Sequence, residues 1–242
     1  KLPDESIIYF GDTEHLPYGE KSDEAIRNFS KKITQFLINK NCKAIVMACN
    51  SAASVAFDVV KKHAKDIPVF NVIDPVVREV ANKCNSCKIG VIGTKATIQS
   101  GVYTKKIQEI CSTAKVAAMA TPLFVPMIEE GFVNEEISHK IIANYLSNKS
   151  LANIDSLILA CTHYPLIYNE INNFYGGKVQ LIDSADIVAN FIFLQLEKRN
   201  LINKNNNSKY QFYVSNYTKS FAKSAKFFFQ EEIEIEEVNI WN

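Results

Sequence analysis

Short apolar runs alternate along this chain with longer segments in which apolar residues recur at helical spacing. The apolar runs are typical of buried strands and lie at residues 7–10, 44–48, 69–73, 89–92, 157–160 and 179–182. Helical spacing is found at residues 23–38, 52–64, 76–81 and 134–146. This alternation predicts an α/β fold built on mainly parallel sheets that are flanked by helices.

The last part of the chain carries predicted elements of its own. Residues 198–209 are basic and rich in asparagine, which is typical of a surface connection. A strand is predicted at residues 210–214, a helix at 219–229 and a second strand at 232–238. We expect this segment to pack back on the body of the protein.

Two of the predicted strands belong to a near-repeat. Residues 45–51 read Ile-Val-Met-Ala-Cys-Asn-Ser, and residues 157–163 read Leu-Ile-Leu-Ala-Cys-Thr-His. Equivalent strand ends from two similar halves place Cys49 and Cys161 across a shared cleft. We therefore predict two similar lobes related by pseudo-two-fold symmetry, with the active site between them. In this division the first lobe comprises residues 1–90 and 185–242, and the second comprises residues 91–184.

Composition narrows the choice of partners and compartment. The 27 basic and 26 acidic residues give a net charge of +1, so the chain has no overall field that attracts nucleic acid. It has no run of about twenty apolar residues and no apolar export signal near residue 1. We expect a cytoplasmic protein that does not enter a membrane.

The six cysteines fit a reducing compartment, so we expect free thiols rather than disulfides. Cys84 and Cys87 have the spacing of half a zinc site, but no second close pair follows them, and we expect no metal. We interpret these two residues, like Cys42 and Cys111, as small packing residues.

The two repeated cysteines have a different setting, because each follows a strand and precedes a predicted helix. Backbone N–H groups and the helix dipole at such a turn lower the pKa of a thiol. One cysteine with a nearby His163 points to nucleophilic catalysis, as in a cysteine hydrolase or an amidotransferase. Two facing thiols instead suit the inversion of a stereocentre, which needs a base on one face of a carbon and an acid on the other.

Other polar turns provide groups that hold a small anion. The Pro-Tyr-Gly turn presents Tyr18 and the backbone N–H of Gly19, and Thr94 and Thr97 lie where a predicted strand ends and a helix opens. Ordinary turns and helix caps have the same residues, so these signals alone are weak. His15, His63 and His139 lie away from any predicted nucleophile and are interpreted as surface or core residues.

Five segments, taken in order, resemble the glutamate racemases of the aspartate/glutamate racemase superfamily, and the resemblance spans nearly the whole chain. They are Tyr-Phe-Gly-Asp-Thr…Pro-Tyr-Gly at 9–19, Ala-Cys-Asn-Ser-Ala at 48–52, Gly-Val-Ile-Gly-Thr-Lys-Ala-Thr at 90–97, Pro-Leu-Phe-Val-Pro at 122–126 and Leu-Ala-Cys-Thr-His-Tyr-Pro at 159–165.

The resemblance implies interconversion of L- and D-glutamate without pyridoxal phosphate or metal, in a homodimer that supplies D-glutamate for peptidoglycan. It implies that Cys49 and Cys161 are the two catalytic thiols and that His163 assists Cys161. The substrate-binding residues that it implies are Tyr18, Gly19, Asn50, Ser51, Thr94, Thr97, Glu129 and Thr162.

Two departures from the family pattern accompany the resemblance. Ser51 stands where the family usually has threonine, which keeps the hydroxyl and loses only a methyl group. The opening family strand, with its Asp-Ser-Gly loop, is not found in residues 1–6, and we expect that it precedes residue 1.

Other functions remain open at this point. An aspartate racemase or a broader amino-acid racemase of the same superfamily would differ in pocket length. A protein that binds a ligand without catalysis would keep the fold. Metal-dependent or nucleotide-dependent chemistry is the third alternative, although the chain has no phosphate-loop motif.

Overall fold

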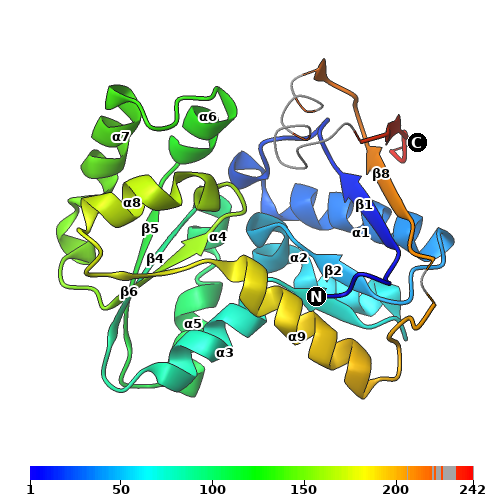
Figure 1. The fold of residues 1–242 in the computed structure, drawn as a ribbon, viewed down its shortest axis with the longest axis horizontal. Helices are drawn as coiled ribbons and strands as arrows, with labels where there is room; N and C mark the ends of the chain where they lie inside the picture. The colour runs from blue at the N-terminus through cyan, green and yellow to red at the C-terminus, as the bar shows by residue number, and fades with distance from the viewer. Residues whose placement is uncertain (206, 220, 222–224, 226–232, 242) are drawn as a thin grey trace.

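The computed structural model describes residues 1–205, 207–219, 221, 225 and 233–241, and two lobes lie side by side in it (Figure 1). Its strands are β1 (Ile7–Gly11), β2 (Ile45–Met47), β3 (Val69–Asn71), β4 (Lys88–Gly93), β5 (Lys115–Ala120), β6 (Ser156–Ala160), β7 (Gln180–Ile182), β8 (Tyr210–Val214) and β9 (Ile235–Glu237). The predicted strands that begin at residues 7, 44, 69, 89, 157, 179 and 210 are thereby confirmed, with small shifts of their ends. β5 escaped the pattern because three of its six residues are alanines and its larger apolar residues, Val116 and Met119, do not alternate.

Helices connect these strands and cover the sheets. They are α1 (Asp23–Asn39), α2 (Asn50–Ala64), α3 (Ile73–Lys83), α4 (Lys95–Gln99), α5 (Val102–Ile110), α6 (Phe124–Glu129), α7 (Glu136–Leu146), α8 (Tyr168–Phe174) and α9 (Ser184–Lys198), with short 3-10 turns η1 (Tyr18–Glu20), η2 (Lys149–Leu151) and η3 (Tyr164–Ile167). Helices were predicted in the regions of α1, α2, α3 and α7, and all four are confirmed.

Local capping explains where some elements begin and end. The predicted strand at 69–73 stops at Asn71, because the Asn71 side-chain oxygen accepts hydrogen bonds from the N–H groups of Ile73 (2.9 Å) and Asp74 (2.8 Å). These bonds satisfy free N–H groups at the start of α3. Glu135 and Ser138 form a capping box at the start of α7, which begins after the predicted residue 134.

Every strand pairing in the described residues is parallel. In the second lobe the strand order is β5-β4-β6-β7, and in the first lobe β1, β8 and β9 form one sheet while β2 and β3 form another. β8 lies beside β1, with Ile7 opposite Tyr210, so the prediction that the C-terminal segment packs back on the body is confirmed. Residues 219–229 and 232–238 were predicted as a helix and a strand. Most of the first segment and the start of the second lie outside the described residues, and β9 begins at Ile235.

The core follows the alternation of side chains along the second-lobe sheet. Ile89 and Val91 of β4 face a cluster that α3, α5 and residues of the first lobe share, whereas Ile92 faces a separate cluster beneath α6, α7 and α8. The strands of this sheet lie between residues 88 and 182, close to the predicted second lobe. The division of the chain at residues 90 and 184, like the two-fold relation of the lobes, remains a prediction.

One expectation about the cysteines is wrong. Cys84 and Cys87 form a disulfide, in the connection between α3 and β4, with their Cα atoms 5.4 Å apart. That separation lies within the range a disulfide spans, and a turn of four residues is enough to reach it. Cys42, Cys49, Cys111 and Cys161 are free thiols.

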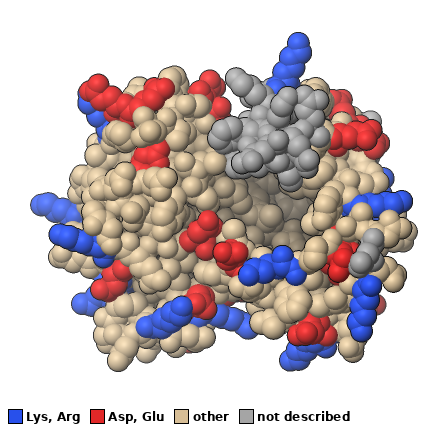
Figure 2. Space-filling view, in the orientation of Figure 1, with Lys and Arg blue, Asp and Glu red and all other residues tan. Residues whose placement is uncertain are grey.

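The surface carries both signs of charge. On the face drawn in Figure 2, Lys and Arg side chains are interspersed with Asp and Glu, in keeping with the small net charge. Among the described residues, no helix is both long enough and apolar enough to span a bilayer.

Candidate active site

Cys49 lies between the end of β2 and the first turn of α2, where it is the N-cap residue. Its side chain is exposed to solvent, and hydrogen bonds from the N–H groups of Ser51 and Ala52 and from the Ser51 hydroxyl favour its thiolate. Surrounding protein atoms nevertheless raise the pKa of the Cys49 thiol above its usual range. The Cys49 thiol is therefore accessible to solvent, although neighbouring protein atoms disfavour its charged form.

Cys161 holds the equivalent place after β6, but it is buried. Burial raises the pKa of the Cys161 thiol to about 12, although the N–H groups of His163 and Thr162 lower it in part. The prediction that these turns lower the thiol pKa is therefore wrong for both cysteines, because desolvation outweighs the N–H groups. Charge on Cys49 also raises the pKa of Cys161, so the two sulfur atoms lie within electrostatic reach of each other.

His163 joins Cys161 to Glu129 in a short chain of polar groups. The Nδ1 atom of His163 lies 3.8 Å from the Cys161 sulfur, and its Nε2 atom lies 3.1 Å from a carboxylate oxygen of Glu129 at the end of α6. The position predicted for His163 beside Cys161 therefore agrees with the structure. Glu129, which was expected to bind substrate, contacts His163, and its role toward substrate remains a prediction.

Three hydroxyl groups connect the first lobe to the second. Ser51 and Thr94 share a hydrogen bond of 2.8 Å, and the Thr94 hydroxyl donates to that of Thr97 at 3.1 Å. Thr94 also caps α4 by accepting from the N–H of Thr97. Residues that were predicted from separate motifs thus meet in one hydrogen-bonded row.

The Tyr18-Gly19 turn packs directly on that row. A Cβ atom on Gly19 would lie 2.7 Å from the Cβ of Thr94, so only glycine fits without movement. The Tyr18 hydroxyl donates to Asp12 at 2.6 Å, and burial together with this bond raises the pKa of Tyr18 well above its usual range. Asp12 also accepts from Ser215 at 2.8 Å and lies 2.9 Å from His15.

Asn50, the residue after Cys49, is buried, and only one of its two side-chain polar groups has a hydrogen-bond partner in the described residues. Its side-chain oxygen accepts from the Tyr103 hydroxyl at 2.7 Å, whereas its Nδ2 group has no partner among the described residues. A buried donor without a partner is costly unless a ligand supplies an acceptor. Tyr103, on α5, escaped sequence reasoning because no local motif links it to Asn50, 53 positions away. Thr162, the remaining predicted residue, is exposed beside Cys161.

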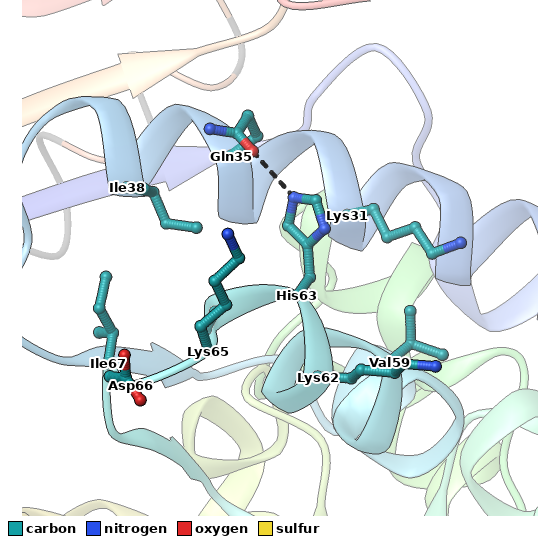
Figure 3. A pocket seen from close by; sticks show the side chains of 10 residues that line it. Lys31, Gln35, Ile38, Val59, Lys62, His63, Lys65, Asp66 and Ile67 are labelled. Carbon is teal, nitrogen blue, oxygen red and sulfur yellow. Dashed lines mark hydrogen bonds between the residues drawn. The ribbon is translucent and has the colours of Figure 1, made fainter.

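One groove lies outside this cluster. A groove of about 780 Å³ between α1 and the end of α2 is lined by side chains that include Lys31, Lys62 and Lys65, and His63 is hydrogen-bonded to Gln35 there (Figure 3). None of the predicted site residues lines that groove. A smaller hollow of about 310 Å³ reaches Gly19 from the side of α4.

Comparison with known proteins places this cluster in context. Residues 1–192 match the family described as Asp/Glu/Hydantoin racemase. The glutamate racemase of Geobacter metallireducens is 42% identical over 79% of this chain and 70% of its own length. Glutamate racemase 3 of Caldanaerobacter subterraneus is 38% identical over 99% of this chain and 87% of its own length.

Solved structures give the same result at the level of the fold. The glutamate racemase of Francisella tularensis, in complex with D-glutamate, superposes with a TM-score of 0.93 at 38% identity, covering 99% of this chain and 90% of that one. A glutamate racemase isoform from Bacillus anthracis superposes with a TM-score of 0.92 at 34% identity, with the same coverage.

Proposed function

This chain belongs to the Asp/Glu/hydantoin racemase family, and from that premise we propose that it is a glutamate racemase in which Cys49 and Cys161 move the α-proton. The observation that carries the proposal is the pair of cysteines at equivalent strand ends, close enough for the charge of one to raise the pKa of the other. In the proposed reaction one thiolate removes the α-proton of glutamate, and the other thiol donates a proton to the opposite face.

The burial of Cys161 sets a condition on this reaction. A thiol with a pKa of about 12 keeps its proton at neutral pH, so it donates readily but needs help before it can act as a base. His163, 3.8 Å away, is suited to accept that proton, and Glu129 stabilises the imidazolium that results. We propose that these two residues serve the direction in which Cys161 removes the α-proton.

The polar residues around the cysteines suit the anionic ends of an amino acid. The unpaired Nδ2 group of Asn50 needs an acceptor, and the hydroxyls of Ser51 and Thr94 provide further donors beside it. Removal of an α-proton spreads negative charge onto the substrate carboxylate. Donors that are fixed before the reaction stabilise this charge better than mobile water does, so we assign Asn50, Ser51 and Thr94 to the carboxylate.

The wider role is inferred from the relatives of this chain. We propose that the enzyme supplies D-glutamate for peptidoglycan synthesis in the cytoplasm, acts as a homodimer and needs no cofactor. Support comes from relatives named glutamate racemase and from the D-glutamate bound in the Francisella tularensis structure.

Proton exchange in deuterated water tests the proposal directly. The protein is incubated with L-glutamate, D-glutamate or L-aspartate without added cofactor, and NMR follows the α-proton while a chiral assay follows inversion. With two separate acid/base groups, the inverted product carries solvent deuterium while the substrate that remains at early times keeps its protium.

Each outcome has a definite meaning. Inversion of glutamate with deuterium confined to the product supports the two-thiol racemase. Deuterium in recovered substrate at the rate of inversion indicates a single base and would contradict the mechanism. Faster turnover of aspartate than of glutamate would reassign the substrate and leave the family unchanged.

A further inference from the structure

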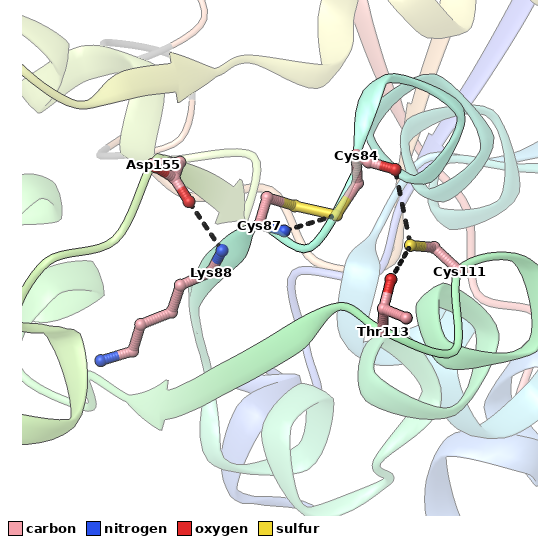
Figure 4. Close-up of a disulfide and its surroundings, with 6 residues drawn as sticks. All are labelled: Cys84, Cys87, Lys88, Cys111, Thr113 and Asp155. Carbon is pink, nitrogen blue, oxygen red and sulfur yellow. Dashed lines mark hydrogen bonds between the residues drawn. A yellow bond between two sulfur atoms is a disulfide. The ribbon is translucent and has the colours of Figure 1, made fainter.

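Three cysteines gather at one end of α3 and α5, outside the cluster assigned to racemisation. Cys84 follows α3, Cys87 precedes β4 and Cys111 follows α5. The first two are joined by a disulfide, and the Cys111 thiol lies against the same turn, 3.5 Å from the carbonyl oxygen of Cys84 (Figure 4). The Cys111 thiol therefore touches the backbone of the residue whose sulfur it would attack in thiol–disulfide exchange.

The surroundings of Cys111 favour its reactive form. Its sulfur lies 3.4 Å from the Thr113 hydroxyl, and that hydrogen bond, with others from the N–H groups of Thr113, Ala114 and Ser86, lowers the pKa of the thiol. Cys42 is a useful contrast, because burial raises the pKa of its thiol. Of these two half-buried cysteines, Cys111 is therefore the better nucleophile near neutral pH.

Access and packing also suit exchange at this place. Asn85 and Ser86, between the bridged cysteines, are exposed, so solvent and small thiols reach the turn. The helices α3 and α5 pack against each other, and Cys84 and Cys111, which follow their last turns, are in contact. The present bridge spans 3 positions and the alternative one spans 27, so exchange converts a link within one turn into a link between two helices.

We propose that Cys84, Cys87 and Cys111 form a thiol–disulfide exchange site, in which Cys111 attacks Cys84 and moves the disulfide from Cys87 to itself. The Cys111 thiolate forms a bond to the Cys84 sulfur, the bond between the Cys84 and Cys87 sulfurs breaks, and its electron pair leaves with Cys87. Cys87 then takes the proton that Cys111 lost to solvent. One disulfide and one thiol are present before and after, so no outside oxidant or reductant takes part.

The positions of the lysines make the exchange easy to measure. Trypsin releases Cys84 and Cys87 on one peptide, which Lys83 and Lys88 bound, and Cys111 on another, between Lys106 and Lys115. The full-length protein, purified without reductant, is incubated at mildly alkaline pH. Samples are acidified, their free thiols are labelled with N-ethylmaleimide, and mass spectrometry follows the two peptides without reduction.

In the wild-type protein, a species in which the two peptides are linked grows with time. Label on Cys111 falls as label on Cys87 rises by the same amount, and the total label per chain stays constant. In Cys111→Ser the linked species falls to background while the bridge within the first peptide remains. Cys42→Ser, the matched loss of another half-buried thiol, behaves as the wild type.

A second variant keeps the proposal testable if Cys111→Ser does not fold. Cys87→Ser leaves Cys84 and Cys111 as the reacting pair, and oxidised glutathione as the probe should join them, with the fold followed by circular dichroism. The proposal is overturned if Cys111 stays fully labelled in the wild type while the bridge between Cys84 and Cys87 persists. It is also overturned if folded Cys87→Ser forms no link between Cys84 and Cys111.

Discussion

At the scale of single residues, Cys49 and Cys161 have similar sequence surroundings but different physical ones. Cys49 is exposed and is held by the Ser51 hydroxyl and two N–H groups, whereas Cys161 is buried and has His163 and Glu129 beside it. Charge on Cys49 raises the pKa of Cys161, so once one thiol has ionised the other keeps its proton and the pair carries a single negative charge. That is the charge state a two-base inversion requires, with one base and one acid.

The first prediction concerns the thiols. We expect Cys49→Ser and Cys161→Ser each to reduce racemisation by about 100-fold or more, because a serine hydroxyl is a much weaker acid and base near neutral pH. Each variant should still exchange the α-proton of one enantiomer without inversion, since one thiol remains on one face. Chiral chromatography and NMR measure the two processes, and Cys42→Ser serves as the control. Full inversion in either variant would exclude the mechanism.

The second prediction concerns pH and His163. Because the pKa of Cys161 is raised to about 12, its base form grows as pH rises, and we expect kcat/KM to increase from neutral to alkaline pH. The equilibrium constant of a racemisation is one, so kcat/KM changes equally in both directions. We expect His163→Asn to lower it by about 100-fold and to enlarge the α-deuterium isotope effect in the direction in which Cys161 is the base.

His139 is exposed, and His139→Asn is the control for His163→Asn. Equal isotope effects in both directions for His163→Asn would argue against a role of His163 in proton removal.

At the scale of elements, the site depends on how closely η1 approaches α4. Gly19 sits where any side chain would meet Thr94, and the neighbouring Glu20 and Lys95 form an exposed ion pair of 3.0 Å across the same junction. Exposed ion pairs contribute little to stability, so the close backbone approach is the constraint that matters.

The third prediction tests that approach. We expect Gly19→Ala to raise the KM for glutamate by about tenfold, the equivalent of 1.4 kcal/mol, because the turn or Thr94 must shift by a few tenths of an ångström or more. Initial-rate kinetics provide the measurement. Glu20→Ala breaks only the exposed ion pair and should leave KM within about twofold. An unchanged KM in Gly19→Ala would remove the turn from the proposed substrate site.

At the scale of the whole molecule, Asp12 joins the two ends of the described chain. Its carboxylate accepts from Tyr18 and from Ser215, which follows β8, and Trp241 packs edge-on against His15. The 4% exposure of the Asp12 side chain makes these hydrogen bonds difficult to replace with water. The C-terminal segment therefore supports the turn that carries Tyr18 and Gly19.

The fourth prediction concerns stability. We expect Asp12→Asn to lower the free energy of unfolding by about 2 kcal/mol, since an amide replaces a charged acceptor of several hydrogen bonds. Urea denaturation followed by circular dichroism measures the change. The exposed Asp58→Asn should stay within about 0.5 kcal/mol of the wild type. Equal stability of the two variants would contradict the supporting role of Asp12.

The sequence by itself determined most of the strands, four of the helices and the residue types of the candidate site. Buried strands in parallel sheets are continuous apolar runs, and helices repeat their apolar residues every three or four positions, so both can be recognised locally. The near-repeat around Cys49 and Cys161, and the motifs with Thr94 and His163, are likewise local. β5 was missed because its alanines carry too little of that signal.

Only the tertiary structure decided which of these groups meet and in what state. The bond from Tyr103 to Asn50, the pairing of Glu129 with His163 and the contact of Cys111 with Cys84 join positions that no local pattern relates. Burial, which depends on the whole fold, raised the pKa values of both site thiols where their local turns predicted a decrease. Periodicity is a property of neighbouring residues, whereas desolvation and long-range contacts arise only when the lobes pack.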